Sequence, residues 1–302
     1  MKIIAPIIID DAALISSNVA ETDYPAFNAA TTYALGTRVI YVAANTHWVV
    51  ESLQNGNIGH TPTGLATDAW WLYVSQTNKW KMFDQAINSQ TSNLNTIDVT
   101  LKSLTTRVDT VSLFNVNAAT ARVRATDVID GLVYDKTINL VSDSGITNWY
   151  DYFFQPIIRL ADTVFSDIPP YLAASIQVTL TDTGNSPMCG ACLLGLSRNI
   201  GDTKYGATTG IQDYSLKQKD AFGNAYILQR AFNKRATFQV WVDNSLIDEL
   251  QNILAKYRAI PTIYVGSDLY KSTSIYGFYK DFSTVISYPT KSILNIEVEG
   301  LI

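Results

Sequence analysis

The sequence has few of the residues on which catalytic and metal sites most often depend. Its 302 residues include only two cysteines, Cys189 and Cys192, and only two histidines, His47 and His60. The C-x-x-C spacing suits a redox pair or half of a zinc site. A structural zinc needs two further ligands, however, and both histidines lie more than a hundred residues away. We expect a buried, reduced cysteine pair on a strand, with no metal site and no cofactor.

A charge excess and long apolar runs are missing too. The 22 basic and 27 acidic residues give a formal net charge of −5, and no basic cluster is longer than Lys234–Arg235. This composition does not indicate a surface for nucleic acid or for anionic membranes. The apolar run at residues 3–9 is interrupted by Pro6 and followed by two aspartates, so it predicts an extended arm or edge strand rather than a signal peptide. No other run approaches the roughly 18 to 20 apolar residues of a membrane span, and we expect a soluble chain without membrane insertion.

Catalytic motifs are absent as well. The sequence contains no G-x-S-x-G elbow, no phosphate-binding glycine loop and no H-E-x-x-H motif. A glycosidase needs only two carboxylates, and the 27 acidic residues leave room for such a pair. Most aspartates lie in turns, however, where hydrogen bonds to the backbone explain them, and Asp127, Asp130 and Asp135 lack the pattern of a calcium loop. We predict a binding or structural protein and not an enzyme, with a polysaccharide hydrolase as the weaker alternative.

Aromatic residues are concentrated between residues 33 and 84, which hold four of the six tryptophans and both histidines. Residues 38–42 and 48–51 are predicted to be two short strands, with Asn45–Thr46 at the tip of the hairpin between them. A pyranose stacks its apolar face on an exposed aromatic ring, while Asn, Thr or His at the rim can bind its hydroxyl groups. The stretch therefore predicts a small β module that binds sugar.

The candidate carbohydrate-binding residues are Tyr41, His47, Trp48, Asn55, Trp70 and Trp71, of which Trp71, Trp48 and Tyr41 are favoured for the sugar face. In an extended strand Trp70 and Trp71 point to opposite faces, so at most one of them belongs to the module's core. The competing interpretation is that most of these rings are core, because a module of about fifty residues has little volume for aliphatic packing. The exit segment, residues 78–84, either closes the module's core or packs on the next domain.

The aromatic, glycine and proline residues of the module follow a characteristic spacing. It reads Tyr33-x-x-Gly36-x-x-Val39-x-Tyr41, followed by Trp48, residues 55–57, Pro62 and Trp70-Trp71. This pattern resembles the small chitin-binding-type carbohydrate-binding modules found in chitinases and in phage tail proteins. The resemblance implies that the module contacts a surface glycan.

Blocks spread over nearly the whole chain carry a second resemblance. They include S-S-x-V-A-E at 16–21, T-x-Y-A-L-G-x-R-V at 31–39 and N-x-W-x-M-F-D at 78–84, where Lys79 stands at the second position. The other blocks lie at residues 3–8, 108–115, 201–207, 213–217, 229–232, 276–282 and 297–301. Together they resemble tail proteins of long-tailed bacteriophages and prophages, which typically have Arg at the position of Lys79.

That resemblance implies a tail-tip or baseplate protein of the virion, assembled in the cytoplasm of the bacterial host. Its partners would be other phage tail-tip proteins, further copies of itself and host cell-surface polysaccharide. The alternative is a purely structural tail adaptor that binds no sugar.

Alternating apolar and polar residues predict the strands of the remaining chain. In the centre they lie at 97–101, 108–114, 121–125 and 176–180, separated by turn signals at 115–119, 130–131, 143–145 and 182–185. In the last third they lie at 236–242, 262–265, 274–279 and 293–299, with a turn at 220–224 and an amphipathic helix from 246 to 257.

These patterns predict a mainly β protein with a small N-terminal β module, a central jelly-roll-like β-sandwich and a C-terminal α+β barrel or split sandwich with one amphipathic helix. The expected divisions are an N-terminal arm and connector at 1–30, the module at 31–84, a linker at 85–95, the sandwich at 96–197 and a tail-component-like domain at 198–302.

A second aromatic cluster, WYDYFF, lies at residues 149–154. As an alternating strand, it would bury one set of rings in the sandwich core. The other set would stay at a surface that binds sugar or, preferably, a neighbouring subunit.

Overall fold

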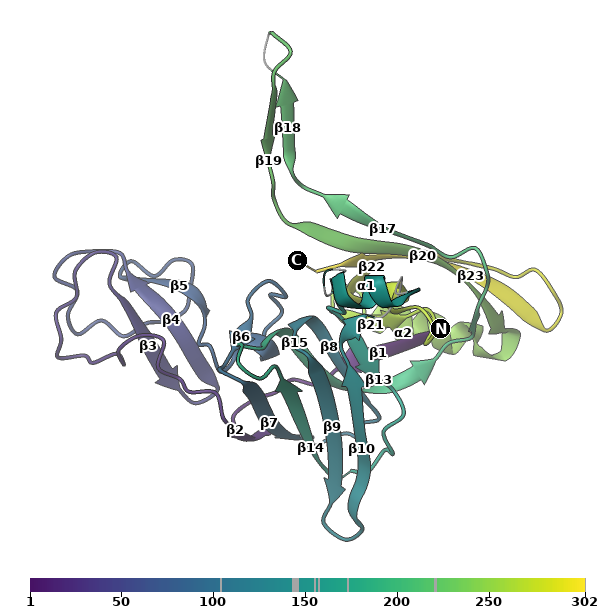
Figure 1. Ribbon diagram of the computed structural model, residues 1–302, viewed down its shortest axis with the longest axis horizontal. Coiled ribbons are helices and arrows are strands. Elements are labelled where there is room, and N and C mark those ends of the chain that lie inside the picture. The colour runs from purple at the N-terminus through teal and green to yellow at the C-terminus, as the bar shows by residue number, and fades with distance from the viewer. Residues whose placement is uncertain are drawn as a thin grey trace.

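The fold is mainly β, as the sequence predicts. The computed structural model describes residues 1–103, 105–142, 147–154, 156, 158–172, 174–219 and 222–301. Figure 1 shows a small three-stranded sheet on the left, a sandwich below, and a C-terminal sheet from which a narrow arm projects. The expected turns at 143–145 and 220–224 lie wholly or partly outside the described residues.

Two sheets pack face to face in the central sandwich. The first has five described strands in the order β10 (Gly131–Asn139), β9 (Thr120–Asp127), β14 (Ser175–Thr181), β7 (Thr96–Lys102) and β2 (Leu14–Ser17). Facing it are β13 (Thr163–Phe165), β8 (Thr110–Asn117) and β15 (Met188–Asn199).

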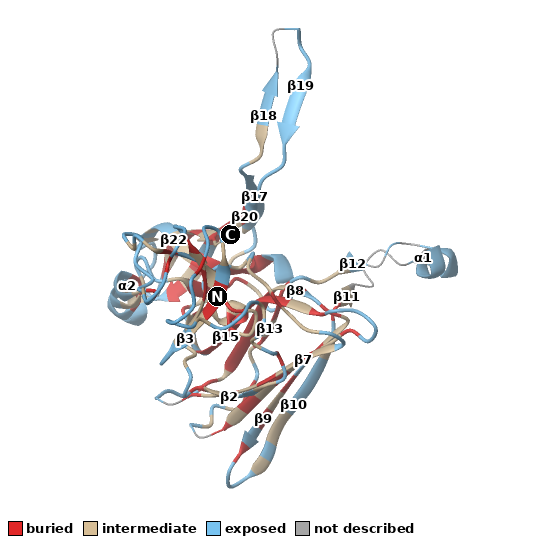
Figure 2. Ribbon diagram, turned by 90° about the vertical axis from the view of Figure 1, so that its left-hand side faces the viewer, coloured by how far each residue is buried: buried red, intermediate tan, exposed pale blue. Residues whose placement is uncertain are grey.

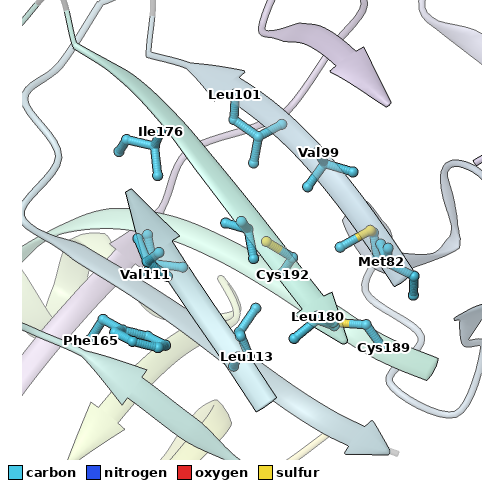
Figure 3. Packing of buried hydrophobic residues seen from close by; sticks show 14 of the residues in the cluster. Met82, Val99, Leu101, Val111, Leu113, Phe165, Ile176, Leu180, Cys189 and Cys192 are labelled. Atoms are coloured by element: carbon cyan, nitrogen blue, oxygen red, sulfur yellow. The ribbon is translucent and has the colours of Figure 1, made fainter. Parts of the chain in front are cut away.

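The sandwich core follows from the alternation in the sequence, because every second side chain of a strand points to the same face. Figure 3 shows these side chains meeting between the sheets. The labelled members of the cluster are Met82, Val99, Leu101, Val111, Leu113, Phe165, Ile176, Leu180, Cys189 and Cys192.

Cys189 and Cys192 are free, buried thiols on β15, in agreement with the expectation from sequence. Burial raises the pKa of the Cys192 thiol to about 12 and that of the Cys189 thiol well above its usual value. Both therefore pack as small apolar side chains. Within the described part of the chain, no group of three or more His, Cys, Asp or Glu side chains is placed to hold a metal ion.

Strand β1 (Lys2–Pro6) joins the sandwich to the C-terminal half. It lies between β15 and β21 (Thr262–Val265) and pairs antiparallel with both, so the prediction of an edge strand was wrong. The physical reason is that the backbone of β1 is paired along both of its edges, which the apolar pattern of the sequence does not reveal. Both faces of β1 are buried as well. Ile3 is buried in the C-terminal core, whereas Ile4 is buried in a separate cluster with Phe114 on the opposite face.

Eleven described strands consequently form one continuous sheet that crosses the expected boundary between residues 197 and 198. Beyond β21 the order is β22 (Ser274–Val285), β23 (Lys291–Gly300), β20 (Phe232–Asp243) and β16 (Asp202–Thr203). In addition, β17 (Thr208–Asp213) pairs with β20, and β6 (Thr91–Ser92) pairs with β15.

Helix α2 (Ile247–Lys256) confirms the predicted amphipathic helix and packs against the C-terminal sheet. Leu250 and Leu254, four residues apart on one face, are buried in the same cluster as Phe238 and Val240 of β20. The 3₁₀ turn η2 (Asn244–Leu246) leads into α2, and η3 (Lys271–Thr273) leads into β22.

Two elements project from the body (Figures 1 and 2). The first, which we call the arm, ends in the hairpin of β18 (Leu216–Lys219) and β19 (Ala225–Leu228) and continues from β17 and β20. The second is α1 (Trp149–Phe154), carried by the short ribbon of β11 (Val141–Ser142) and β12 (Ile158–Arg159).

The prediction of an alternating, half-buried strand at residues 149–154 was wrong. The segment is a helix, and its five aromatic side chains, those of Trp149, Tyr150, Tyr152, Phe153 and Phe154, are all exposed. Five apolar residues out of six fit a strand period and a helix period equally well. No partner strand lies beside α1 within the described residues, so the rings are not buried by the chain itself.

Candidate carbohydrate-binding module

The aromatic module is built on a three-stranded antiparallel sheet of β3 (Arg38–Ala43), β4 (Thr46–Ser52) and β5 (Trp71–Gln76). Asn45 forms the predicted hairpin tip between β3 and β4, with a positive φ of 55°. The register pairs Tyr41 with Trp48 and Val50 with Tyr73. These side chains therefore share one face of the sheet.

One end of this face is the core of the module. Trp71 is only 2% exposed, and its ring centroid lies 5.2 Å from that of Tyr33 and 5.7 Å from that of Phe27. The Trp71 Nε1–H donates a hydrogen bond of 2.6 Å to the backbone oxygen of His60. The assignment of Trp71 to a sugar face was therefore wrong, because a module this small uses its largest ring as core.

The loop between β4 and β5 covers two further tryptophans. His60 stacks on Trp70, with 3.7 Å between ring centroids and 9° between planes. Gly64, with φ +70°, lies so close to Trp48 that a Cβ atom there would be 2.2 Å from the indole Cη2. Trp48 and Trp70 are accordingly only partly exposed.

Asp68 holds this loop in place. Its carboxylate accepts hydrogen bonds from the Thr63 hydroxyl at 2.7 Å and from the backbone N–H groups of Trp70 and Trp71 at 2.9 and 3.1 Å. Burial alone would raise the pKa of Asp68, but these hydrogen bonds outweigh burial and the pKa is lowered. The loop is thus fixed by a charged residue that sequence reasoning had not singled out.

His47 does not face a sugar site. Its Nδ1 lies 2.7 Å from a carboxylate oxygen of Glu21, its Nε2 lies 2.6 Å from one of Asp11, and its ring stacks on Trp80 at 4.3 Å. The pKa of Asp11 is lowered by the Asn45 backbone N–H and by His47. His47 therefore links the module to the N-terminal segment. Its assignment to the rim of a sugar site was wrong.

Asn55 is exposed, and its side-chain oxygen accepts a hydrogen bond of 3.0 Å from the Leu35 N–H. It supports the turn that precedes β3. The neighbouring Asn57 is fully buried and donates to Ser52 Oγ at 3.1 Å and to the Trp70 backbone oxygen at 3.3 Å. The Asn55–Asn57 motif thus stabilises the loops around the sheet.

The exit segment anchors the module to the sandwich. Trp80 lies between His47 and Phe83, and Met82, in η1 (Lys81–Phe83), is fully buried in the sandwich core. The Met82 N–H donates to Thr91 Oγ1 at 2.9 Å. Of the two alternatives for residues 78–84, the structure supports packing on the next domain, and the expected linker at 85–95 includes β6 of the large sheet.

Three rings that are partly or largely exposed form a row, Tyr41–Trp48–Tyr73, which we call the aromatic row. Ring centroids are 6.2 Å apart between Tyr41 and Trp48 and 5.9 Å apart between Trp48 and Tyr73. Tyr73 is 40% exposed, and burial of its remaining part, together with the charge of Asp84, raises its pKa. Sequence reasoning missed Tyr73, although it stands two residues after Trp71 and so lies on the same face.

No protein-family model matches the chain, and no curated protein sequence matches it either. The resemblances to chitin-binding-type modules and to phage tail proteins therefore rest on the sequence blocks alone. None of the helices that the structure describes has the length and apolarity to cross a bilayer.

Proposed function

We propose that this protein is a structural subunit of the tail tip, or baseplate, of a long-tailed bacteriophage. In this role the C-terminal half docks onto neighbouring tail-tip proteins, including further copies of the same chain, and the aromatic module contacts host cell-surface polysaccharide. The protein resides in the virion tail after assembly in the host cytoplasm. It acts by binding and assembly and not as an enzyme.

The arm is the observation that carries the assembly role. It is a two-stranded ribbon that projects from the body, and isolated ribbons of this kind are only marginally stable in water (Figure 2). The pairing of Leu216 with Leu228 and of Gln218 with Tyr226 places Leu216, Tyr226 and Leu228 on one face. Near the tip, Phe222 is 92% exposed. A projecting ribbon with one largely apolar face is suited to packing on another subunit.

Helix α1 supports the same role. Its exposed rings belong to residue types that are enriched at protein interfaces, since large aromatic side chains contribute much contact area with little loss of rotamer freedom. The arm and α1 thus supply two separate apolar surfaces on projecting elements. A subunit that must contact several neighbours requires such surfaces.

The aromatic row supports the contact with glycan. The planes of Tyr41 and Trp48 differ by 38°, so these two rings suit stacking on the apolar face of a sugar, and Tyr73, whose plane lies at 82° to that of Trp48, borders them. Each such contact is weak. Multiple copies in one virion tip would strengthen attachment, because the first contact raises the effective concentration of the others.

The purely structural adaptor is the second candidate. It is favoured by the burial of Trp71, by the His60 ring on Trp70 and by the attachment of His47 to two carboxylates. In that case the aromatic row would pack against a neighbouring tail protein instead of sugar.

Sedimentation of the full chain with insoluble chitin tests the glycan contact. We expect Trp48→Ala and Tyr73→Ala to reduce the bound fraction, whereas Trp149→Ala, which removes an exposed tryptophan far from the row, should leave it unchanged. Equal binding by all four proteins, or no binding by the wild type, would favour the structural adaptor.

Light scattering over a range of concentrations tests the self-association. We expect the wild-type chain to oligomerise and Leu228→Glu to weaken oligomerisation, because the charge lies on the apolar face of the arm. Ala225→Glu, in the same strand but on the other face, is the matched control. A wild type that stays monomeric throughout would contradict self-association through the arm.

A further inference from the structure

A polar cavity of about 400 Å³ lies where the aromatic module meets the body. Its wall combines residues from both parts: Tyr24 from the segment that enters the module, Arg38 from β3, and Asn78, Lys81 and Gln90 from the segment that leaves it. This volume falls within the range of small-molecule sites. The cavity is separate from the candidate residues of the aromatic row, because no member of the row lines it.

The wall is held in place by hydrogen bonds across the junction. The Asn78 backbone N–H donates to Asp23 Oδ2 at 2.6 Å, and the Asn78 side chain donates to the Ser92 backbone oxygen at 2.8 Å. In return, the Ser92 N–H donates to Asn78 Oδ1 at 2.9 Å. Asn78 therefore links the segment that enters the module, through Asp23, to β6, through Ser92. A wall fixed in this way loses little conformational freedom when a ligand binds.

Other groups of the wall remain available to a ligand. Lys81 Nζ makes no hydrogen bond or salt bridge within the described residues. Gln90 donates its amide to the Asn115 backbone oxygen at 2.8 Å, which leaves its side-chain oxygen as an acceptor. The partly exposed Tyr24 ring supplies a flat apolar surface, and its hydroxyl is 3.4 Å from Arg38 Nη1. The cavity thus offers donors, an acceptor and one aromatic face.

The charges in and around the wall are balanced. The Nε of Arg38 forms a salt bridge of 2.7 Å with Glu51, and the charge of Lys81 acts on the nearby carboxylate of Asp84. Asp23 adds a further negative charge to the wall. This balance disfavours a strongly anionic or cationic ligand. Mixed donors and acceptors beside one aromatic face suit the hydroxyl groups and the CH face of a neutral sugar.

We propose that this cavity is a second saccharide-binding site, which takes a unit of a neutral oligosaccharide with its CH face on Tyr24 and its hydroxyls toward Lys81 and Gln90. The inference rests on the proposed glycan contact and extends it. The glycan is held at the junction between module and body as well as on the aromatic row. A sugar bound there contacts both parts and reinforces the junction.

Titration calorimetry of the full chain tests this site, with chitotetraose, cellotetraose and maltotetraose as neutral probes and tetragalacturonate as an anionic probe. We expect Lys81→Met and Tyr24→Leu each to weaken binding of the best neutral probe by about fivefold to tenfold, the loss of one hydrogen bond or one ring contact. Lys79→Met and Tyr205→Leu are the matched controls, because neither residue lines the cavity. Urea unfolding of each variant verifies that it folds.

Weaker binding by the two cavity variants, with both controls unchanged, supports the site. If Trp48→Ala abolishes binding while the cavity variants bind normally, the cavity site is refuted and the proposed glycan contact stands. If no neutral probe binds the wild-type chain, both proposals fail for these sugars. Binding of tetragalacturonate alone, with loss at high salt, would refute the assignment to a neutral sugar.

Discussion

Substitution of Gly64 by alanine probes the contact between the loop and Trp48, the partly covered ring of the aromatic row. Gly64 has φ +70°, and an added Cβ would lie 2.2 Å from Trp48 Cη2 and 2.4 Å from Cζ3. Gly59, in the same loop, has φ +75° but no atom within 4 Å of the corresponding position. Both substitutions place a side chain in the left-handed region, at a cost of about 1–2 kcal/mol. Only Gly64→Ala must also displace the indole, which adds ~1–3 kcal/mol as overpacking.

Urea unfolding followed by tryptophan fluorescence measures the difference, because four of the six tryptophans lie within residues 33–84. We expect Gly64→Ala to lower the free energy of unfolding more than Gly59→Ala does. In a Trp48→Leu background the smaller side chain should relieve the clash, so that Gly64→Ala costs no more than Gly59→Ala. Equal losses for the two alanine variants in the wild-type background would show that the loop does not press on Trp48.

Trp71, Asp84 and the two cysteines are wholly or partly buried and can each be tested. Trp71→Ala should destabilise the module by about 3–5 kcal/mol, as for other buried large rings, and the urea midpoint measures this loss. A loss smaller than that from replacing an exposed tryptophan would contradict the place of Trp71 in the core. Burial raises the pKa of Asp84 to about 6, because the neutral carboxyl is easier to bury than the charged one. The contribution of Asp84 to the stability of the fold is therefore greatest below about pH 4, and this contribution is lost as the pH rises through about 6. Asp84→Asn keeps the acceptor for the Ala86 N–H. Its free energy of unfolding should exceed that of the wild type by about 1 kcal/mol near pH 7, after allowance for partial exposure, and should equal it near pH 4. Melting temperatures across this pH range check the sign. Cys189 and Cys192 should resist a thiol reagent in the native protein and react in denaturant, because both thiols are buried with raised pKa values.

The strands of the sandwich and the C-terminal helix could be predicted because they depend on short-range patterns. Ile97, Val99 and Leu101 alternate with polar residues and are all fully buried in β7. Leu250 and Leu254 recur at the helical period and are buried in α2. In both cases the spacing of apolar residues reveals which face must leave water.

The candidate site was predictable only in part. Tyr41 and Trp48 lie in the aromatic row, as the hairpin pattern suggests, but Trp71 is core and His47 is bound to two carboxylates. The carboxylates come from residues 26 and 36 positions away in the chain. No local pattern indicates such partners, because they meet only after the N-terminal segment has packed against the module.

The spacing of apolar residues, with a period of two in strands and of about 3.6 in the helix, was enough to predict a mainly β protein, the hairpin of the module and the helix of the C-terminal half. These features depend on residues a few positions apart, whose relative directions are set by backbone geometry. Only the folded chain decided that β1 is an interior strand, that α1 is an exposed helix and that Trp71 is enclosed. The burial of a side chain depends on segments that are distant in the sequence, and tertiary packing brings them together.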